Sequence, residues 1–278
     1  MILRFKKSLI PVILLTVLSG LVVFGQEAAD KTAEKKTEPN TSAPLVTSKN
    51  GLKNPTAEQL IETTIFVYGL GGGRASLNQI RKTAFERGKV SVVNAEGKME
   101  QANYQRWIAS DGTSNKRKIR LDQEFPTARY SLVFSDDKIF GIFNDSVFTP
   151  REDASRAFQN QIVYGLDTLL RYKENGSKLE LGGREKMMGV DFFLVDVTDT
   201  QNRKTRFYIS AKTFRVMMLD YEDAGIKYRR KFYDYNAAQG TLVAYRSVLY
   251  AGDKIVEETE IGTVTYGQKI DDGMFSAG

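Results

Sequence analysis

Three extended segments that follow one another in the chain decide the fold, and they read VDFFLVDVT at 190–198, RKTRFYIS at 203–210 and FRVMMLDYE at 214–222. The first and third are apolar at consecutive positions, so both faces of these strands are apolar. Only a few residues separate each segment from the next, which indicates hairpins and not crossovers. The stretch therefore predicts neighbouring antiparallel strands.

Further strands are expected on both sides of this stretch, with turn sequences between them. Asn94-Ala-Glu-Gly97, Asp111-Gly112 and Asp136-Asp137 are such turns. Besides the three segments above, we expect strands at 83–93, 100–109, 115–122, 128–135, 138–143, 178–182, 225–235, 241–251 and 254–266.

Helices are expected at only a few places. Asn54 can cap a helix that begins at Pro55, and apolar residues then recur at three- and four-residue spacing. A shorter helical segment is expected at 76–82. A second long helix is predicted at 151–172, and Asn175-Gly176 ends it.

These helices are too few to cover both faces of so many apolar strands. The fold class that fits is α+β: a strongly curved antiparallel sheet, an unclosed half-barrel of about ten or eleven strands. The helices cover its concave apolar face, with the 151–172 helix against it. This geometry makes a cavity, and a well-filled core between sheet and helices is the alternative.

The composition removes most catalytic chemistry. The 278 residues include no Cys and no His. Disulfides, thiolate nucleophiles, a lipid-anchored N-terminal cysteine, Cys or His zinc sites and the serine triad are therefore excluded. No other catalytic candidates stand out, and we expect a binding protein that is not an enzyme and uses neither cofactor nor metal.

Glycine-rich and acidic segments have structural explanations. Gly69-Leu-Gly-Gly-Gly73 follows a helix and not a strand, so it ends that helix and is not a phosphate-binding loop. Asp136-Asp137, Glu222-Asp223 and Asp271-Asp272 fall at expected turns, where Asp is favoured by its hydrogen bonds to the backbone.

The charge balance does not favour nucleic acid. The formal net charge is +6, and without Arg4, Lys6 and Lys7 it is +3, because 37 basic residues then face 34 acidic ones. Nucleic-acid binding usually needs a concentrated basic face. The basic clusters at 116–118 and 229–231 fit exposed strand faces. The alternative for these clusters is a contact with anionic lipid headgroups or with an acidic partner.

The N-terminus has the layout of a secretory signal. Three basic residues precede an apolar run, and Val23-Phe24-Gly25 supplies short residues before a cleavage at Gln26. Residues 1–25 are therefore expected to be a signal peptide or, if uncleaved, an inner-membrane anchor. Residues 26–53 are polar, which predicts a disordered linker. A single folded domain is then expected at 54–278, in the periplasm.

Motifs in the second half of the chain resemble a known family. LGGREKMMGVD at 181–191, a strand, and RFYISAKT at 206–213 are similar to a passage of the bacterial lipoprotein-carrier superfamily, the LolA/LolB-like proteins. That passage reads Gly-Lys-Glu-x-Val-x-Gly, a strand, then Tyr-x-Asp-x-x-Thr. IDDGMF at 270–275 is similar to the family's closing Pro-Asp-x-x-Phe, and the opening helix with Gly-Gly-Arg fits its outer-membrane lipoprotein-sorting relatives. Ser210 stands where the family usually has Asp, and Phe214 stands where a Gly commonly follows the motif's Thr.

This resemblance implies an unclosed β-barrel with a helical lid over an apolar cavity, which in that family takes acyl chains without chemistry. It covers residues 55–278. We predict that large apolar residues of the core-facing elements line the cavity. Because both faces of the strands are apolar, a one-residue slip in register would reverse which residues face inward. The predicted lining residues are Trp107, Phe134, Phe140, Phe158, Ile162, Leu166, Phe193, Val195 and Met217.

Two functions are compatible with these expectations. The first is an exported periplasmic carrier that binds a lipid, a lipoprotein acyl chain or another apolar ligand. The alternative is a membrane-tethered envelope module, for interaction or sensing, that uses the half-barrel to bind a protein partner. A membrane surface or envelope proteins are possible partners in both cases.

Overall fold

The computed structural model describes residues 54–94, 96–110 and 117–276. The predicted signal segment 1–25 and linker 26–53 lie outside the described residues, as does the predicted turn at Asp111-Gly112.

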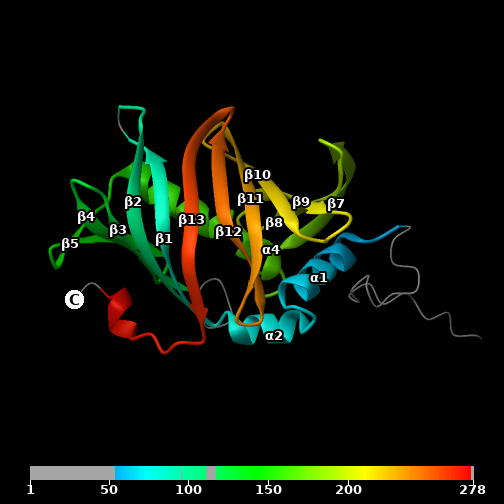
Figure 1. The fold of residues 1–278 in the computed structure, drawn as a ribbon, viewed down its shortest axis with the longest axis horizontal. Helices are drawn as coiled ribbons and strands as arrows, with labels where there is room; N and C mark the ends of the chain where they lie inside the picture. The colour runs from blue at the N-terminus through cyan, green and yellow to red at the C-terminus, as the bar shows by residue number, and fades with distance from the viewer. Residues whose placement is uncertain (1–53, 95, 111–116, 277–278) are drawn as a thin grey trace, which may run out of the picture. The chain divides into compact units, whose positions relative to one another are not determined.

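Thirteen strands of the described residues form one antiparallel sheet, which is strongly curved and does not close (Figure 1). The order across it is β6-β5-β4-β3-β2-β1-β13-β12-β11-β10-β9-β8-β7. The predicted α+β half-barrel is thus confirmed, but its sheet has thirteen strands and not the ten or eleven expected. β1 and β13 pair in the middle of the sheet. The strands are β1 (Thr83–Val93), β2 (Met99–Ala109), β3 (Lys118–Glu124), β4 (Arg129–Ser135), β5 (Lys138–Phe143), β6 (Ser146–Phe148), β7 (Lys178–Met187), β8 (Val190–Thr198), β9 (Lys204–Ser210), β10 (Val216–Asp223), β11 (Ile226–Ala238), β12 (Thr241–Ala251) and β13 (Lys254–Tyr266).

Two strands differ clearly from the sequence prediction. The short edge strand β6 was not predicted, because its three residues are exposed and show no alternation. β7 continues five residues beyond its predicted end at 182. The two glycines there form a bulge, with a register shift between Leu181 and Gly183, and do not end the strand.

The first helix, α1 (Ala57–Tyr68), begins two residues later than predicted. Thr56 is the N-cap instead of Asn54. Its hydroxyl accepts a hydrogen bond from the Gln59 backbone N–H at 3.1 Å, and the Gln59 side chain accepts one from the Thr56 N–H at 3.0 Å. This reciprocal capping box satisfies two N–H groups at the start of the helix. The short helix α2 (Gly73–Ile80) follows.

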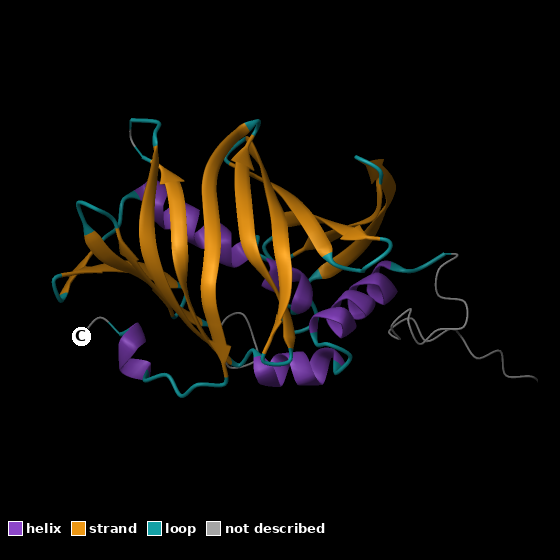
Figure 2. Cartoon of the chain, in the orientation of Figure 1, coloured by secondary structure: helices purple, strands orange, loops and turns teal. Residues whose placement is uncertain are grey.

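The helix predicted at 151–172 is in fact two helices, α3 (Glu152–Val163) and α4 (Leu166–Leu170). Gly165 is extended between them, and a Cβ there would lie 2.6 Å from the Gln161 carbonyl oxygen, so the break favours glycine. Figure 2 shows α3 behind the central strands, on the hollow side of the sheet. No helix within the described ranges is long and apolar enough to cross a membrane.

The main core lies where α1 and α4 pack against β8–β12. Leu60 and Ile65 of α1, Leu169 of α4 and Phe207 of β9 are all fully buried there. On the other side of the sheet, the C-terminal turn η3 (Asp272–Phe275) packs on β3 and β4 through Phe275. The concave face near β1–β5 is left for α3 to cover.

Candidate functional site

A second apolar cluster, which we call the α3 cluster, lies between α3 and strands β1–β5. Phe158 is 2% exposed and is the one buried residue of α3, while Ile162 is partly buried beside it. A helix with a single buried side chain is held to the sheet by a small apolar area. The buried members of the α3 cluster are Val90, Ala102, Tyr104, Ile119, Leu121, Leu132 and Phe158, and Phe134 and Ile139 are among those packed around them.

Two polar contacts complete the attachment of α3. The Asn160 side-chain amide donates to the Asp223 carboxylate at 2.9 Å, and the Gln161 amide donates to the Glu257 carboxylate at 2.9 Å. Glu257 is buried and also accepts a hydrogen bond from Arg230 at 2.8 Å. Burial alone would raise the pKa of Glu257, but Arg230 and these hydrogen bonds hold it below its usual value. The carboxylate therefore stays charged at neutral pH and can hold the helix.

Charged side chains lie where the α3 cluster and the main core meet. Glu86 of β1 pairs with Arg106 of β2 at 2.6 Å. Asp167, in the first turn of α4, pairs with Arg81 at 3.5 Å and also with Arg117. Burial would raise the pKa of Asp167, yet the nearby guanidinium groups hold it well below its usual range. The concave face is thus divided into two apolar regions with ion pairs between them.

Six of the nine predicted lining residues face the concave side, in two groups. Those in the α3 cluster are Phe134, Phe158 and Ile162. Those in the main core are Leu166, Phe193 and Val195. Phe193 and Val195 are 2% and 0% exposed, which indicates tight packing against α1 and α4. A ligand-binding role for either group stays a prediction, and only the α3 cluster is covered by one lightly attached helix.

The other three predicted residues, Trp107, Phe140 and Met217, lie on the outer side of the sheet. The Trp107 ring packs on Phe85 with 5.2 Å between centroids, while its chain neighbours face inward. Phe140 follows the inward-facing Ile139, and Met217 joins a separate outer cluster. Because both faces of these strands carry apolar residues, their hydrophobicity pattern does not reveal which side faces the helices.

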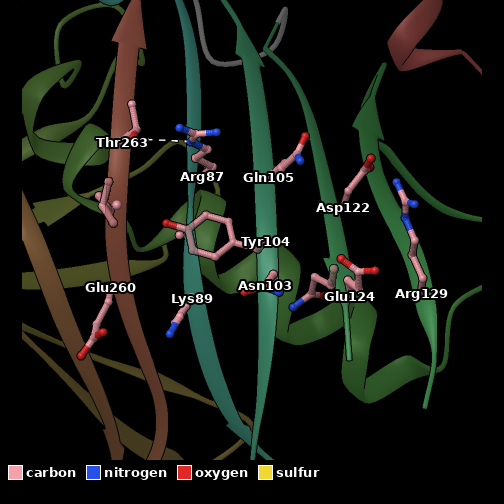
Figure 3. A pocket seen from close by; sticks show the side chains of 14 residues that line it. Arg87, Lys89, Asn103, Tyr104, Gln105, Asp122, Glu124, Arg129, Glu260 and Thr263 are labelled. Carbon is pink, nitrogen blue, oxygen red and sulfur yellow. Dashed lines mark hydrogen bonds between the residues drawn. The ribbon is translucent and has the colours of Figure 1, made fainter. Parts of the chain in front are cut away.

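A hollow of about 560 Å³ lies on the outer face of β13, β1, β2, β3 and β4 (Figure 3). It forms at a bulge where a Cβ on Gly88 would lie 2.0 Å from the Glu260 carbonyl oxygen. Sequence reasoning missed it, because a lone glycine in a strand signals at most a bulge. None of the predicted lining residues contributes to it. Its charged side chains are Arg87, Lys89, Asp122, Glu124, Arg129 and Glu260.

The chemistry of this hollow does not suit an apolar ligand. Cations and carboxylates alternate around it, and Arg87 donates to the Thr263 hydroxyl at 3.5 Å across its upper part (Figure 3). Within the described ranges, no group of three or more Asp, Glu, His or Cys side chains could hold a metal ion, so its acidic residues do not form a metal site. The α3 cluster is the stronger candidate.

Comparison with known proteins identifies the fold. No protein-family model matches the chain, and no curated protein is similar enough in sequence to match it. A LolA superfamily protein from Nitrosomonas europaea matches in structure with a TM-score of 0.56 and 10% identity, over 80% of this chain and 98% of that one. A DUF1329 family protein from Desulfovibrio piger gives a TM-score of 0.54 and 12% identity, over 78% and 97%.

A third match is the putative outer membrane lipoprotein-sorting protein domain from Vibrio parahaemolyticus. Its TM-score is 0.50 at 11% identity, over 77% of this chain and 97% of that domain. Each match spans nearly the whole of the other chain, so the likeness concerns the entire half-barrel and not one hairpin. The chain has the fold of the LolA-like superfamily.

Proposed function

We propose that the protein is an exported, non-catalytic carrier in the periplasm, and that it binds the acyl chain of a lipid or lipoprotein, or another apolar ligand, beneath α3. The observation that carries this proposal is the uneven attachment of the helices. α1 buries seven residues, whereas α3 buries Phe158 alone over a face that is apolar on five strands. The lipoprotein-sorting name of the Vibrio parahaemolyticus domain supports the same ligand class.

The energies favour exchange of α3 for a ligand. Exposing Phe158 costs about 1.5–3 kcal/mol of burial free energy. A chain of about twelve methylenes gains on the order of 10 kcal/mol on entering an apolar site, before the costs of association. A ligand that takes the place of Phe158 and Ile162 therefore recovers more apolar burial than α3 loses. Such binding needs no hydrogen bond between the ligand and the protein.

The contacts at the two ends of α3 indicate which end can lift from the sheet. α3 is joined to α4 through the extended Gly165, and α4 belongs to the main core. Tyr164, just before this glycine, stacks on Tyr221 of β10 with 4.2 Å between ring centroids, which fixes the C-terminal end of α3. The N-terminal end follows β6, a short edge strand whose three residues are all exposed. Opening is therefore expected at the N-terminal end, with the turn at Gly165 as the hinge.

A crosslink tests whether α3 must move. The chain has no native cysteine, so Asn160→Cys with Asp223→Cys gives one unique pair, at a position where the native side chains touch at 2.9 Å. A short, cleavable thiol crosslinker then fastens α3 to β10. We expect the crosslinked protein to bind no fluorescent fatty acid, and cleavage of the linker to restore binding.

The matched control crosslinks α3 to itself. Glu152→Cys with Arg156→Cys spans one turn of the same helix, where the native pair is 2.5 Å apart, and leaves α3 free to lift. This variant should bind the probe before and after cleavage. Equal binding by the helix-to-sheet crosslinked protein would contradict the proposal, and so would a failure of every uncrosslinked form to bind any acyl probe.

A further inference from the structure

Positive charge is in excess where the α3 cluster and the main core meet on the concave face. Four arginine side chains and only two carboxylates gather there among the described residues. The arginines, which we call the arginine cluster, are Arg81, Arg106, Arg117 and Arg171, and the carboxylates are Glu86 and Asp167. Residues 111–116, outside the described ranges, contain one Asp and one Lys and so add no net charge. The balance is therefore two positive charges.

Both carboxylates of this region are already shared between two donors. Glu86 accepts hydrogen bonds from the Arg106 guanidinium and from the Tyr104 hydroxyl, each at 2.6 Å. Asp167 accepts from Arg81 at 3.5 Å and from a second arginine. Neither carboxylate is therefore left to balance a further guanidinium.

Arg171 carries the excess charge most clearly. It is 6% exposed, it pairs with no carboxylate in the described part of the chain, and its guanidinium donates to the Arg81 carbonyl at 3.2 Å. Burial lowers the pKa of Arg117, and the charges of Arg171 and Arg106 lower it further, although Asp167 acts in the opposite direction. Because a buried charge without a counter-charge is costly, the arginine cluster favours a further anion.

Unused hydrogen-bond donors lie in the same region. Within the described ranges, seven buried side-chain nitrogen or oxygen atoms have no hydrogen-bond partner, and three of them are Arg106 Nε, Arg117 Nε and Ser110 Oγ. Arg106 and Ser110 are four residues apart along β2, so they share one face of the sheet. Ala109 pairs with Lys118, which places Ser110 opposite Arg117. These three groups can all donate to an anion.

The arginine cluster adjoins the apolar face beneath α3. Ile108 lies between Arg106 and Ser110 on the concave face, and its cross-strand partner Ile119 follows Arg117 by two residues. Both isoleucines belong to the α3 cluster or pack against it. The Arg106 side chain is 28% exposed, so a ligand can reach the arginines from the concave side.

We propose that the arginine cluster binds an anionic head group, a carboxylate or a phosphate, of the ligand whose acyl chain lies beneath α3. Guanidinium groups suit both anions, because their N–H donors form paired, charge-assisted hydrogen bonds with the anion's oxygen atoms. This inference rests on the proposed function and narrows its ligand from any apolar compound to an anionic amphiphile.

Ligands with one chain length and different head groups test the inference. Dodecanoate, dodecyl phosphate and uncharged dodecanol each compete with an uncharged fluorescent acyl probe for the full chain. We expect both anions to bind at least tenfold more tightly than dodecanol, because only they form charge-assisted hydrogen bonds with the arginines. The tighter of the two anions then identifies the head group as carboxylate or phosphate.

Substitutions show whether the arginine cluster causes this preference. Arg117→Gln leaves Asp167 paired with Arg81, and it should weaken the binding of both anions about tenfold and leave dodecanol unchanged. Arg87→Gln on the outer face of β1 is the control, because it changes the net charge equally, and it should alter no affinity.

A second pair of variants supplies the counter-charge from the protein itself. Ser110→Asp places a carboxylate opposite Arg117, and Ser110→Asn is its uncharged match. We expect Ser110→Asp to have the higher Tm of the two and to bind dodecanoate no more tightly than dodecanol. This result does not depend on the stability of Arg117→Gln.

The outcomes separate this inference from the proposed function. Dodecanol that binds as tightly as the two anions would overturn the inference and leave acyl binding intact. A preference for anions that persists in both Arg117→Gln and Ser110→Asp would overturn it too, and so would a Ser110→Asp variant that is less stable than Ser110→Asn. An uncharged acyl probe that does not bind at all would contradict the proposed function, and the inference would fail with it.

Discussion

Replacing Phe158 with alanine should release α3 while the rest of the domain stays folded. Phe158 is 2% exposed and is the one buried side chain of the helix. Removal of a buried phenylalanine costs about 3–5 kcal/mol, and we expect about 3 kcal/mol because α3 can settle into the space. At about 1.4 kcal/mol per factor of ten, the open form of α3 becomes about 100-fold more populated.

Native-state hydrogen exchange measures this opening residue by residue. The α3 amides should lose about 100-fold of their protection, whereas the amides of β8–β10 should keep theirs. The control is Phe207→Ala in the main core, where the side chain is fully buried, and this variant should lower protection throughout the domain. If Phe158→Ala reduces protection in β8–β10 as much as in α3, the helix does not open independently and the reasoning is wrong.

Further predictions concern the attachment of α3, the outer hollow and α1. Because the pKa of Glu257 is lowered in the folded protein, its charged form stabilises the fold fully above the ordinary pKa of 4.5. This stabilisation is lost as the pH falls through the lower pKa of the folded state, and the hydrogen-exchange protection of α3 should decline over the same pH range. Glu257→Gln should remove that part of the pH dependence. Gly88→Ala forces a Cβ against the Glu260 carbonyl and should cost about 2 kcal/mol or more in urea unfolding, whereas Gly262→Ala, with its nearest contact at 3.5 Å, should cost much less. Thr56→Ala removes the capping box of α1 and should cost about 1 kcal/mol in the same assay.

The sequence predicted the architecture because turn residues between strands and runs of apolar residues within them are local signals. β1 at 83–93, β12 at 241–251 and β13 at 254–266 agree residue for residue with the sequence prediction. The prediction failed at two glycine positions, because a glycine can either end an element or lie within or between elements. The strand predicted at 178–182 continues to Met187, because Gly182 and Gly183 form a bulge within β7. The 151–172 helix was predicted whole although Gly165 divides it.

The candidate site was only partly predictable, for two physical reasons. The alternation of a strand does not say which side faces the helices when both sides are apolar, so Phe134 was placed correctly on the concave side while Trp107 was not. The ion pairs between the two apolar clusters join residues far apart in the sequence, such as Arg117 and Asp167. Such pairs leave no short-range pattern, and nothing in the sequence marked them.

Native mass spectrometry of the protein purified gently from its host envelope tests the central claim most directly. We expect a fraction of the molecules to carry an added mass that matches an acyl-containing ligand. That mass should leave on activation and should not rebind once α3 is crosslinked to β10 through positions 160 and 223. A protein that carries no such mass, and that acquires none when incubated with lipids from the same envelope, would contradict the account.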